Sequence, residues 1–205
     1  MGYKIKPMKI ALTGGIACGK SNVAQLFEQL GAEVISLDEL SRQVVVPGSA
    51  GLSELVDCFG DDILTVDKTL NRKILQEILL KNKANQQLIE DILHPKILEK
   101  MQMEIENCKK QLIIIEIPLL VEKNLAYLFD RAIIVECNEE NQLKRLIKRE
   151  KIDKNSAKTL ISAQTSHSNR LKLADQLSID VIENNLEIFD LEQKVRNLYQ
   201  KLINL

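Results

Sequence analysis

After the apolar run Ile10-Ala11-Leu12, the chain reads Gly14-Gly15-Ile16-Ala17-Cys18-Gly19-Lys20-Ser21 and continues into residues 23–30, whose pattern is helical. This segment matches G-x-x-x-x-G-K-[ST], the phosphate-binding P-loop pattern, in the order strand, loop and helix. The glycines let backbone N–H groups turn toward an anion, and the positive end of the helix dipole points to the same place. Lys20 supplies a charge for the β- and γ-phosphates, and the Ser21 hydroxyl is a ligand for Mg²⁺. The sequence therefore predicts a nucleoside triphosphate site.

Composition limits the classes of protein that the chain can represent. With 45% apolar and 28% charged residues, the 205-residue chain is an ordinary globular protein, long enough for a substantial core. A net charge of −1 and 3% aromatic residues argue against a basic nucleic-acid surface or a base-stacking platform. The most apolar stretch, residues 112–121, is too short to span a bilayer. We expect a cytoplasmic protein, a monomer or weak homo-oligomer, with no nucleic-acid or membrane partner.

The four cysteines lie far apart and show no metal-binding spacing: Cys18, Cys58, Cys108 and Cys137. Reduced thiols are the simplest prediction. Cys18 is near Lys20 and a helix N-terminus, both of which favour a thiolate, and this predicts an oxidation-sensitive thiol in the loop. The alternative is that Cys18 is only a small residue that fills space in the loop. Residues 1–7 lack a hydrophobic signal core and are expected to form a disordered extension before Met8.

Strand and helix patterns alternate along most of the chain. Four further short apolar runs predict strands at residues 33–36, 112–116, 132–136 and 179–182. Helices are predicted at residues 38–44, 52–59, 70–80, 85–106, 139–148, 155–164, 168–174 and 186–202. This alternation predicts an α/β fold, with a parallel sheet covered by helices on both faces. The stretch from 52 to 107 is too long for one crossover helix and predicts a helical insert, in which His94-Pro95 kinks or splits the last helix.

A P-loop occurs in kinases, GTPases and other ATPases, so other residues must discriminate among these classes. Residues 57–60 and 82–85 imitate GTPase motifs, but both lie in the helical stretch and the second ends in Asn85 instead of aspartate. Asp38 follows the second predicted strand, where the acceptor site of a small-molecule kinase lies. It could orient or deprotonate an acceptor hydroxyl, or only cap the following helix.

Further motifs run nearly from end to end. They are Leu12-Thr13-Gly14-Gly15-Ile16, Gly19-Lys20-Ser21, Gly31-Ala32, Val34-Ile35, Asp38, Arg42-Gln43-Val44-Val45, Pro47-Gly48, His94-Pro95, Pro118-Leu119-Leu120-Val121-Glu122, Gln142-Leu143-Lys144-Arg145, Arg149, Ala163-Gln164 and Ala174-Asp175. In these segments the chain resembles the dephospho-CoA kinase family of the P-loop NTPase superfamily. The resemblance implies transfer of the ATP γ-phosphate to the ribose 3′-hydroxyl of dephospho-CoA, which gives coenzyme A in the last step of its biosynthesis. It also implies one kinase domain: a core at about 8–46, 110–140 and 175–205, a helical CoA-binding insert at about 47–109, and a mobile lid at about 141–174.

The same resemblance assigns roles residue by residue. The implied catalytic residues are Asp38, Lys20 and Arg145. The implied ATP-binding residues are Gly15, Ile16, Ala17, Cys18, Gly19, Lys20, Ser21, Asn22 and Arg149. The implied residues on the substrate side are Asp38, Arg42, His94, Pro118, Leu119 and Glu122. The predicted ligands of Mg²⁺ are Ser21 and Glu116, since Glu116 directly follows an apolar strand as a Walker-B acid does.

Several of these positions have a plainer interpretation. Arg145 and Arg149 lie four residues apart and could form only a solvated helix face. Glu116 could be a strand-end carboxylate without a ligand, and His94 could serve only the helix break.

The chain departs from the family pattern at a few positions. Ser36 stands where the family has the first acid of Asp-Ala-Asp, which predicts a working enzyme with altered metal demand. Ala17-Cys18 and Asn22 replace the usual Gly-Ser and Thr, and residues 176–186, near the adenine in the family, follow its pattern poorly. A nucleoside monophosphate kinase and a nucleotide-binding regulator without catalysis are the alternatives.

Overall fold

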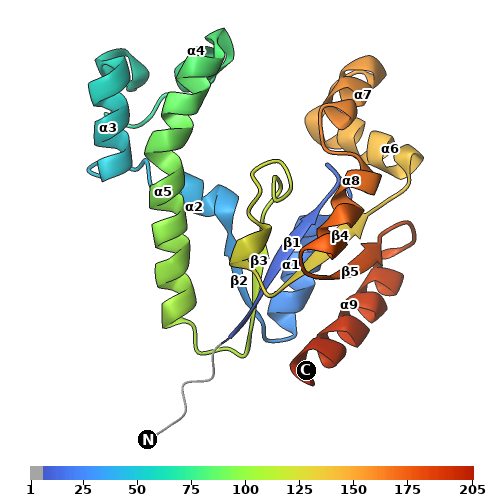
Figure 1. Ribbon diagram of the computed structural model, residues 1–205. Coiled ribbons are helices and arrows are strands. Elements are labelled where there is room, and N and C mark those ends of the chain that lie inside the picture. The colour runs from blue at the N-terminus through green and yellow to red at the C-terminus, as the bar shows by residue number, and fades with distance from the viewer. Residues whose placement is uncertain (1–6) are drawn as a thin grey trace, which may run out of the picture. The chain divides into compact units, whose positions relative to one another are not determined.

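The computed structural model describes residues 7–205, so that nearly all of the expected N-terminal extension lies outside the described residues (Figure 1). The chain divides into two compact units. One contains the described residues up to Ser36 together with Cys108–Leu205, and the other contains Leu37–Asn107. Each unit is described by itself.

The larger unit is built on a parallel sheet. Within the described residues its strands are β1 (Met8–Gly14), β2 (Glu33–Ser36), β3 (Leu112–Glu116), β4 (Arg131–Glu136) and β5 (Ser178–Glu183). They pair in the order β2-β3-β1-β4-β5, and every pairing is parallel. The first strand is therefore central, and β1 and β3 end at the same edge of the sheet, where ligands bind in open α/β folds.

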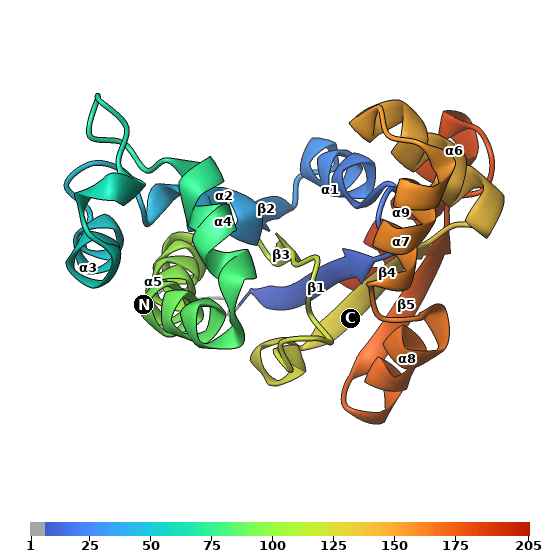
Figure 2. The same ribbon diagram turned by 90° about the horizontal axis from the view of Figure 1, so that it is seen from above.

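Helices cover both faces of this sheet. The helices of this unit are α1 (Lys20–Gln29), α6 (Glu139–Glu150), α7 (Lys154–Ser162), α8 (His167–Leu171) and α9 (Ile188–Ile203), with 3₁₀ turns at Ala126–Leu128 and Lys172–Asp175. Those that pack against the strands are α1, α8 and α9. Figure 2 shows α1 and α8 on opposite sides of the strands. Successive residues of β1 are fully buried, as expected for a central strand with two covered faces. The α/β class with a parallel sheet, predicted from the sequence, is confirmed.

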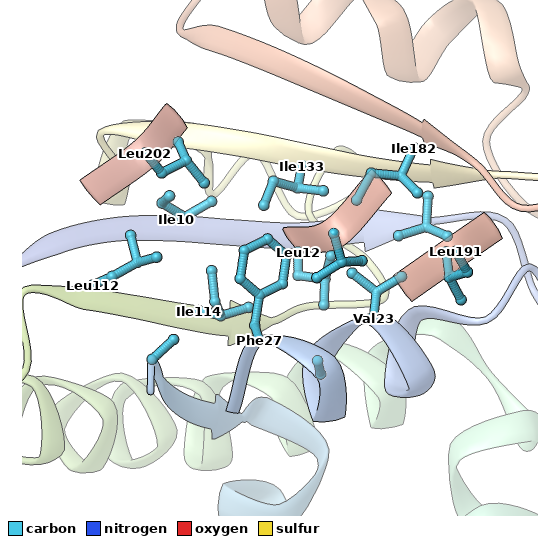
Figure 3. Close-up of a cluster of buried hydrophobic side chains, with 14 of the residues drawn as sticks. Ile10, Leu12, Val23, Phe27, Leu112, Ile114, Ile133, Ile182, Leu191 and Leu202 are labelled. Atoms are coloured by element: carbon cyan, nitrogen blue, oxygen red, sulfur yellow. The ribbon is translucent and has the colours of Figure 1, made fainter. Parts of the chain in front are cut away.

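The main core lies between the sheet and the helices α1 and α9 (Figure 3). Alternate residues of β1, Ile10 and Leu12, point into it, because a strand directs every second side chain to the same face. Phe27 of α1 is fully buried against them. This packing fixes the strand and the helix that flank the glycine loop, and so fixes the loop's two ends.

The smaller unit is helical. It contains α2 (Leu37–Gln43), α3 (Ala50–Phe59), a 3₁₀ turn at Asp61–Ile63, α4 (Arg72–Lys81) and α5 (Lys83–Asn107). Ser49 and Asn71 accept hydrogen bonds from backbone N–H groups in the first turns of α3 and α4, as N-cap residues do. The unit has its own apolar cluster, formed by Val44, Val45, Leu55, Ile63, Ile89 and Ile92 with partly buried neighbours.

Two local expectations about this unit are corrected. The helix α2 begins at Leu37, directly after β2, so that Asp38 lies inside its first turn and is not its N-cap. A kink or a split is expected at His94-Pro95, and the split does not occur: α5 runs from Lys83 to Asn107 with Pro95 inside it. Proline costs a helix one backbone hydrogen bond, and packing of α5 against α2, α3 and α4 compensates for this loss.

An ion pair joins the edge strand β5 to its neighbours and gives a prediction about acid stability. Asp180 accepts hydrogen bonds from Arg131 of β4 at 2.9 Å and from Lys201 of α9 at 2.7 Å. Burial raises the pKa of Asp180, but the hydrogen bonds and charges of Lys201 and Arg131 outweigh burial and hold the pKa below its ordinary value. This group stabilises the fold above the pKa of the unfolded carboxyl, about 3.9, and the stabilisation is lost as the pH falls through the lowered folded value.

We therefore expect Asp180→Asn to lower the free energy of unfolding by about 1–2 kcal/mol at pH 7. The difference from the parent protein should shrink below about pH 4. Urea unfolding at pH 7 and pH 3 measures it, with Glu192→Gln on the exposed side of α9 as the control. A difference that stays constant between the two pH values would contradict the assignment.

Candidate active site

The glycine loop between β1 and α1 has the backbone of an anion cradle. Ala17 and Gly19 have positive φ angles of 58° and 98°, and Gly19 is the N-cap of α1. A Cβ atom at Gly19 would lie 2.4 Å from the Nδ2 atom of Asn184, so only glycine fits there. Successive left-handed and helical residues turn backbone N–H groups to one side, and the N-terminus of α1 adds its own amides.

Two side chains at the start of α1 lie where phosphate and metal chemistry would require them. The ammonium of Lys20 donates to the carbonyl oxygens of Gly14 and Gly15, at 3.1 Å each. The hydroxyl of Ser21 donates to Oε1 of Glu116 at 3.0 Å. Ser21 and Glu116, the two predicted ligands of Mg²⁺, lie 95 residues apart in sequence and are brought together by the fold. A hydroxyl and a carboxylate are hard oxygen ligands, which suit Mg²⁺.

Ser36 lies beside this pair in the sheet. In the pairing of β2 with β3, Ser36 is the register partner of Glu116. Neighbouring residues in register point to the same face of a sheet. The departure from the family's first acid therefore removes a carboxylate from the immediate surroundings of the predicted metal ligands.

Two glutamines from distant segments hold the loop at Ile16. The side chain of Gln142 in α6 donates to the Ile16 carbonyl at 2.9 Å. The Ile16 N–H donates to Oε1 of Gln164, just after α7, at 2.7 Å. Both hydrogen bonds are partly buried, and together they engage the backbone N–H and the backbone carbonyl of Ile16. The loop is therefore fixed by the segment that the resemblance assigns to the lid.

A third contact comes from the turn after β5. Asn184 is 7% exposed and donates from Nδ2 to the carbonyl of Cys18 at 2.8 Å. Its own carbonyl accepts a hydrogen bond from Arg145 of α6 at 3.1 Å. Arg145 is thereby placed beside the loop, whereas Arg149, one turn later, pairs with Glu150 on the exposed side of α6.

Sequence reasoning missed Asn184, Gln142 and Gln164 as loop contacts. Their signals were present but weak. Asn184 directly follows the last strand at the ligand-binding edge, and both glutamines stand among the family motifs.

A buried ion pair supports the segment after α7. Glu136, the last residue of β4, accepts from Arg170 at 2.5 Å and 3.0 Å, and both residues are less than 10% exposed. Arg170 also donates to the carbonyl of Thr165, and Nδ1 of His167 lies 3.3 Å from Oε1 of Glu136. These groups line a pocket of about 430 Å³ that also includes Cys137.

The segment that follows β3 takes up a structural role in this unit. Leu120 is fully buried, whereas Leu119 is 43% exposed. Glu122 accepts the N–H of Thr165 at 3.1 Å. Burial raises the pKa of Glu122, but the hydrogen bonds from Thr165 and the charge of Arg170 outweigh it and lower the pKa below its ordinary value. Glu122 therefore stays ionised and ties the segment after β3 to the segment after α7.

The remaining candidates belong to the helical unit. Asp38 and Arg42 are exposed on α2, four residues apart and so on one face, and Arg42 lies 3.7 Å from Glu39. His94 lies within α5, and its Nε2 atom is buried without a hydrogen-bond partner in the described structure. A buried polar atom without a partner is costly, so this atom is a candidate for pairing with a ligand or a water molecule.

The expectation of four reduced cysteines is not met. A disulfide joins Cys18 to Cys137, whose Cα atoms lie 5.2 Å apart, while Cys58 and Cys108 are free. The Cys18 side chain is fully buried. The structure thus directs its sulfur away from the solvent side of the loop, where the sequence had suggested a reactive thiol.

Comparisons with known proteins agree with this geometry. The family model described as CoaE, dephospho-CoA kinase, matches residues 8–190. A dephospho-CoA kinase of Vibrio vulnificus is 40% identical over 195 residues, which cover 95% of each chain. A solved protein of Thermus thermophilus superposes with a TM-score of 0.80 at 25% identity, covering 96% of this chain and 98% of that one. The solved dephospho-CoA kinase of Campylobacter jejuni superposes with a TM-score of 0.63 at 25% identity over 96% and 97% of the two chains. These likenesses confirm the P-loop kinase fold.

Within residues 7–205, no helix has both the length and the apolar character needed to cross a bilayer.

Proposed function

The chain belongs to the dephospho-CoA kinase family, and we propose that it uses the residues described above to transfer the γ-phosphate of ATP to the ribose 3′-hydroxyl of dephospho-CoA. Such a transfer requires a phosphate cradle, compensation of charge and an oriented acceptor hydroxyl. The observation that carries the proposal is the Ser21–Glu116 contact, which lies beside a glycine loop with residues of positive φ. A candidate metal site and a candidate triphosphate site are therefore adjacent at one edge of the sheet.

In this proposal the loop residues from Gly15 to Asn22 bind the phosphates of ATP. Lys20 exchanges its contacts with the loop carbonyls for the β- and γ-phosphate oxygens, which are the stronger, charged acceptors. Ser21 and Glu116 would hold Mg²⁺, which would neutralise phosphate charge when bound. Among the described residues no group of three or more acidic, His or Cys side chains gathers for a metal.

We assign the acceptor side to the helical unit. Asp38 follows the end of β2 by two residues, which keeps its Cα within about 7 Å of that of Ser36 by chain length alone. It orients the 3′-hydroxyl and accepts its proton as the phosphoryl group arrives. Arg42, four residues further on the same face, compensates substrate charge, and His94 pairs its buried Nε2 with the substrate. Pro118, Leu119 and Glu122 contribute from the segment after β3.

The segment 141–174 acts as a lid in this proposal. Arg145 and Arg149 of α6 bring positive charge to the triphosphate, and closure of the segment excludes the water that would otherwise hydrolyse ATP. Arg145 is supported by its contact with Asn184, while Arg149 must leave its exposed pair with Glu150. An exposed pair of this kind contributes little, so the exchange costs little. The insert at about 47–109 binds the CoA moiety, and we place the enzyme in the cytoplasm as a monomer or weak homo-oligomer.

An assay with ATP and dephospho-CoA tests the proposal. We expect ATP-dependent formation of coenzyme A. Turnover with a nucleoside monophosphate alone would indicate the related class of kinases, and nucleotide binding without any turnover would indicate a regulator.

Replacement of Ser36 provides a test of the metal site. Ser36→Asp adds a carboxylate beside Glu116, and we expect half-maximal activity at a lower Mg²⁺ concentration, by roughly 3- to 10-fold, because the added charge attracts the ion. Titration of Mg²⁺ at saturating ATP measures this shift. Ser36→Asn is the control, because asparagine has nearly the size of aspartate but carries no charge. An unchanged metal dependence in Ser36→Asp would contradict the placement of the metal.

A further inference from the structure

Cys18 and Cys137 come together because of the sheet register. In the pairing of β1 with β4, Gly14 lies opposite Val135. The glycine loop begins after Gly14. The turn into α6 begins after Glu136, which is the residue next to Val135. Cys18 and Cys137 therefore meet just beyond the paired strand ends, with their Cα atoms 5.2 Å apart, within the usual range for a disulfide.

The two sulfurs differ in burial. Cys18 is fully buried and precedes the N-cap of α1. Cys137 is only partly buried and lines the pocket of about 430 Å³, so that small molecules can reach it. A pair with one accessible and one buried sulfur is suited to stepwise oxidation, because the oxidant meets the accessible sulfur first.

From this arrangement we propose that Cys18 and Cys137 form a reversible redox modification site that fastens the glycine loop to the root of α6. Hydrogen peroxide entering the pocket oxidises the Cys137 thiolate to a sulfenic acid, and the peroxide takes up a proton to leave one water. The Cys18 thiolate then attacks the Cys137 sulfur, the S–S bond forms, and the hydroxyl group leaves as a second water with a further proton. Two thiols and one peroxide thus give one disulfide and two waters. A dithiol reductant returns both cysteines to thiols.

The phosphate cradle is present in the disulfide-bonded structure. There Ala17 and Gly19 have positive φ angles, and Ser21 contacts Glu116. The Cys18 side chain belongs to the main apolar cluster. Oxidation therefore ties together two segments that are 119 residues apart and removes the accessible thiol from irreversible oxidation, while ATP still binds.

Peptide mapping of the full-length protein after limited treatment with hydrogen peroxide tests this inference. We expect a cross-linked peptide that contains Cys18 and Cys137, and its loss after dithiothreitol. The thermal midpoint of the oxidised protein should exceed that of the reduced protein by roughly 5–15 °C, because closing so long a loop restricts the unfolded chain. The oxidised protein should still bind ATP, as measured by calorimetry.

Matched variants separate this pair from general oxidation. Cys137→Ser should abolish both the cross-link and the peroxide-dependent rise in the midpoint. A Cys58→Ser, Cys108→Ser double variant, which removes the two free thiols, should keep both. The inference is overturned if the cross-linked peptide is missing from the oxidised parent protein, if the rise survives in Cys137→Ser, or if oxidation abolishes ATP binding. None of these readouts depends on dephospho-CoA, so failure of the proposed phosphoryl transfer would be recognised separately.

Discussion

Asp38→Asn is expected to lower kcat by about 10²–10⁴-fold, because a positioned general base contributes an acceleration of this size. Asparagine keeps the size of the side chain and its ability to hydrogen-bond, but it cannot take the hydroxyl proton. In the proposed mechanism the glycine loop, and not Asp38, binds the phosphates of ATP, so the ATP dissociation constant should change little. Steady-state kinetics with dephospho-CoA, together with calorimetric titration of ATP, measure both quantities.

Glu39→Gln is the matched control for this variant. Glu39 is the next residue in the first turn of α2, is likewise exposed, and loses the same charge on substitution. It should retain nearly full activity. Equal losses of kcat in the two variants would attribute the effect to the charge of the α2 N-terminus and would remove the base role from Asp38.

Arg170→Ala is expected to lower the free energy of unfolding by about 3–5 kcal/mol, because it leaves the Glu136 carboxylate buried without its partner. For a chain of this length, such a loss lowers the thermal midpoint by roughly 6–20 °C. It also removes the contact with the Thr165 carbonyl, which supports the segment after α7. Denaturant unfolding and thermal melting measure the change.

A double variant separates the cost of the unpaired buried charge from the cost of the lost packing. In a Glu136→Gln, Arg170→Met double variant no charge is left buried, and most of the stability should return. Arg149→Ala, which breaks the exposed pair with Glu150, should cost less than about 1 kcal/mol. If Arg170→Ala costs no more than Arg149→Ala, the pair does not stabilise the fold in the way its burial suggests.

Much of the fold could be predicted from local pattern. The buried run at residues 112–116 coincides with β3, because central parallel strands are continuous apolar segments that few helices resemble. Residues 33–36 coincide with β2, which is shorter, lies at the edge of the sheet and is only partly apolar. Helix starts were less predictable. Asp38 is a residue type that often serves as an N-cap, yet α2 begins at Leu37, one residue before Asp38, because the helix continues directly from β2.

The site was predictable where one segment contains all of its parts and unpredictable where distant segments meet. Lys20 and Ser21 follow from the loop pattern itself. The contacts of Gln164 with Ile16 and of Asn184 with Cys18 span 148 and 166 residues, and nothing in the spacing of such residues indicates that they meet. The pairing of Cys18 with Cys137 depends in the same way on the register of β1 and β4.

The central position of β1 has a consequence for synthesis of the chain on the ribosome. Its partner β3 follows about 100 residues later, so at about 5–20 residues per second an unpaired apolar strand waits some 5–20 s for its first neighbour. The helical unit, which has its own apolar cluster, is translated entirely within that interval. The segment made first thus completes its hydrogen bonding late, and nascent chains should depend on chaperones most strongly before β3 emerges.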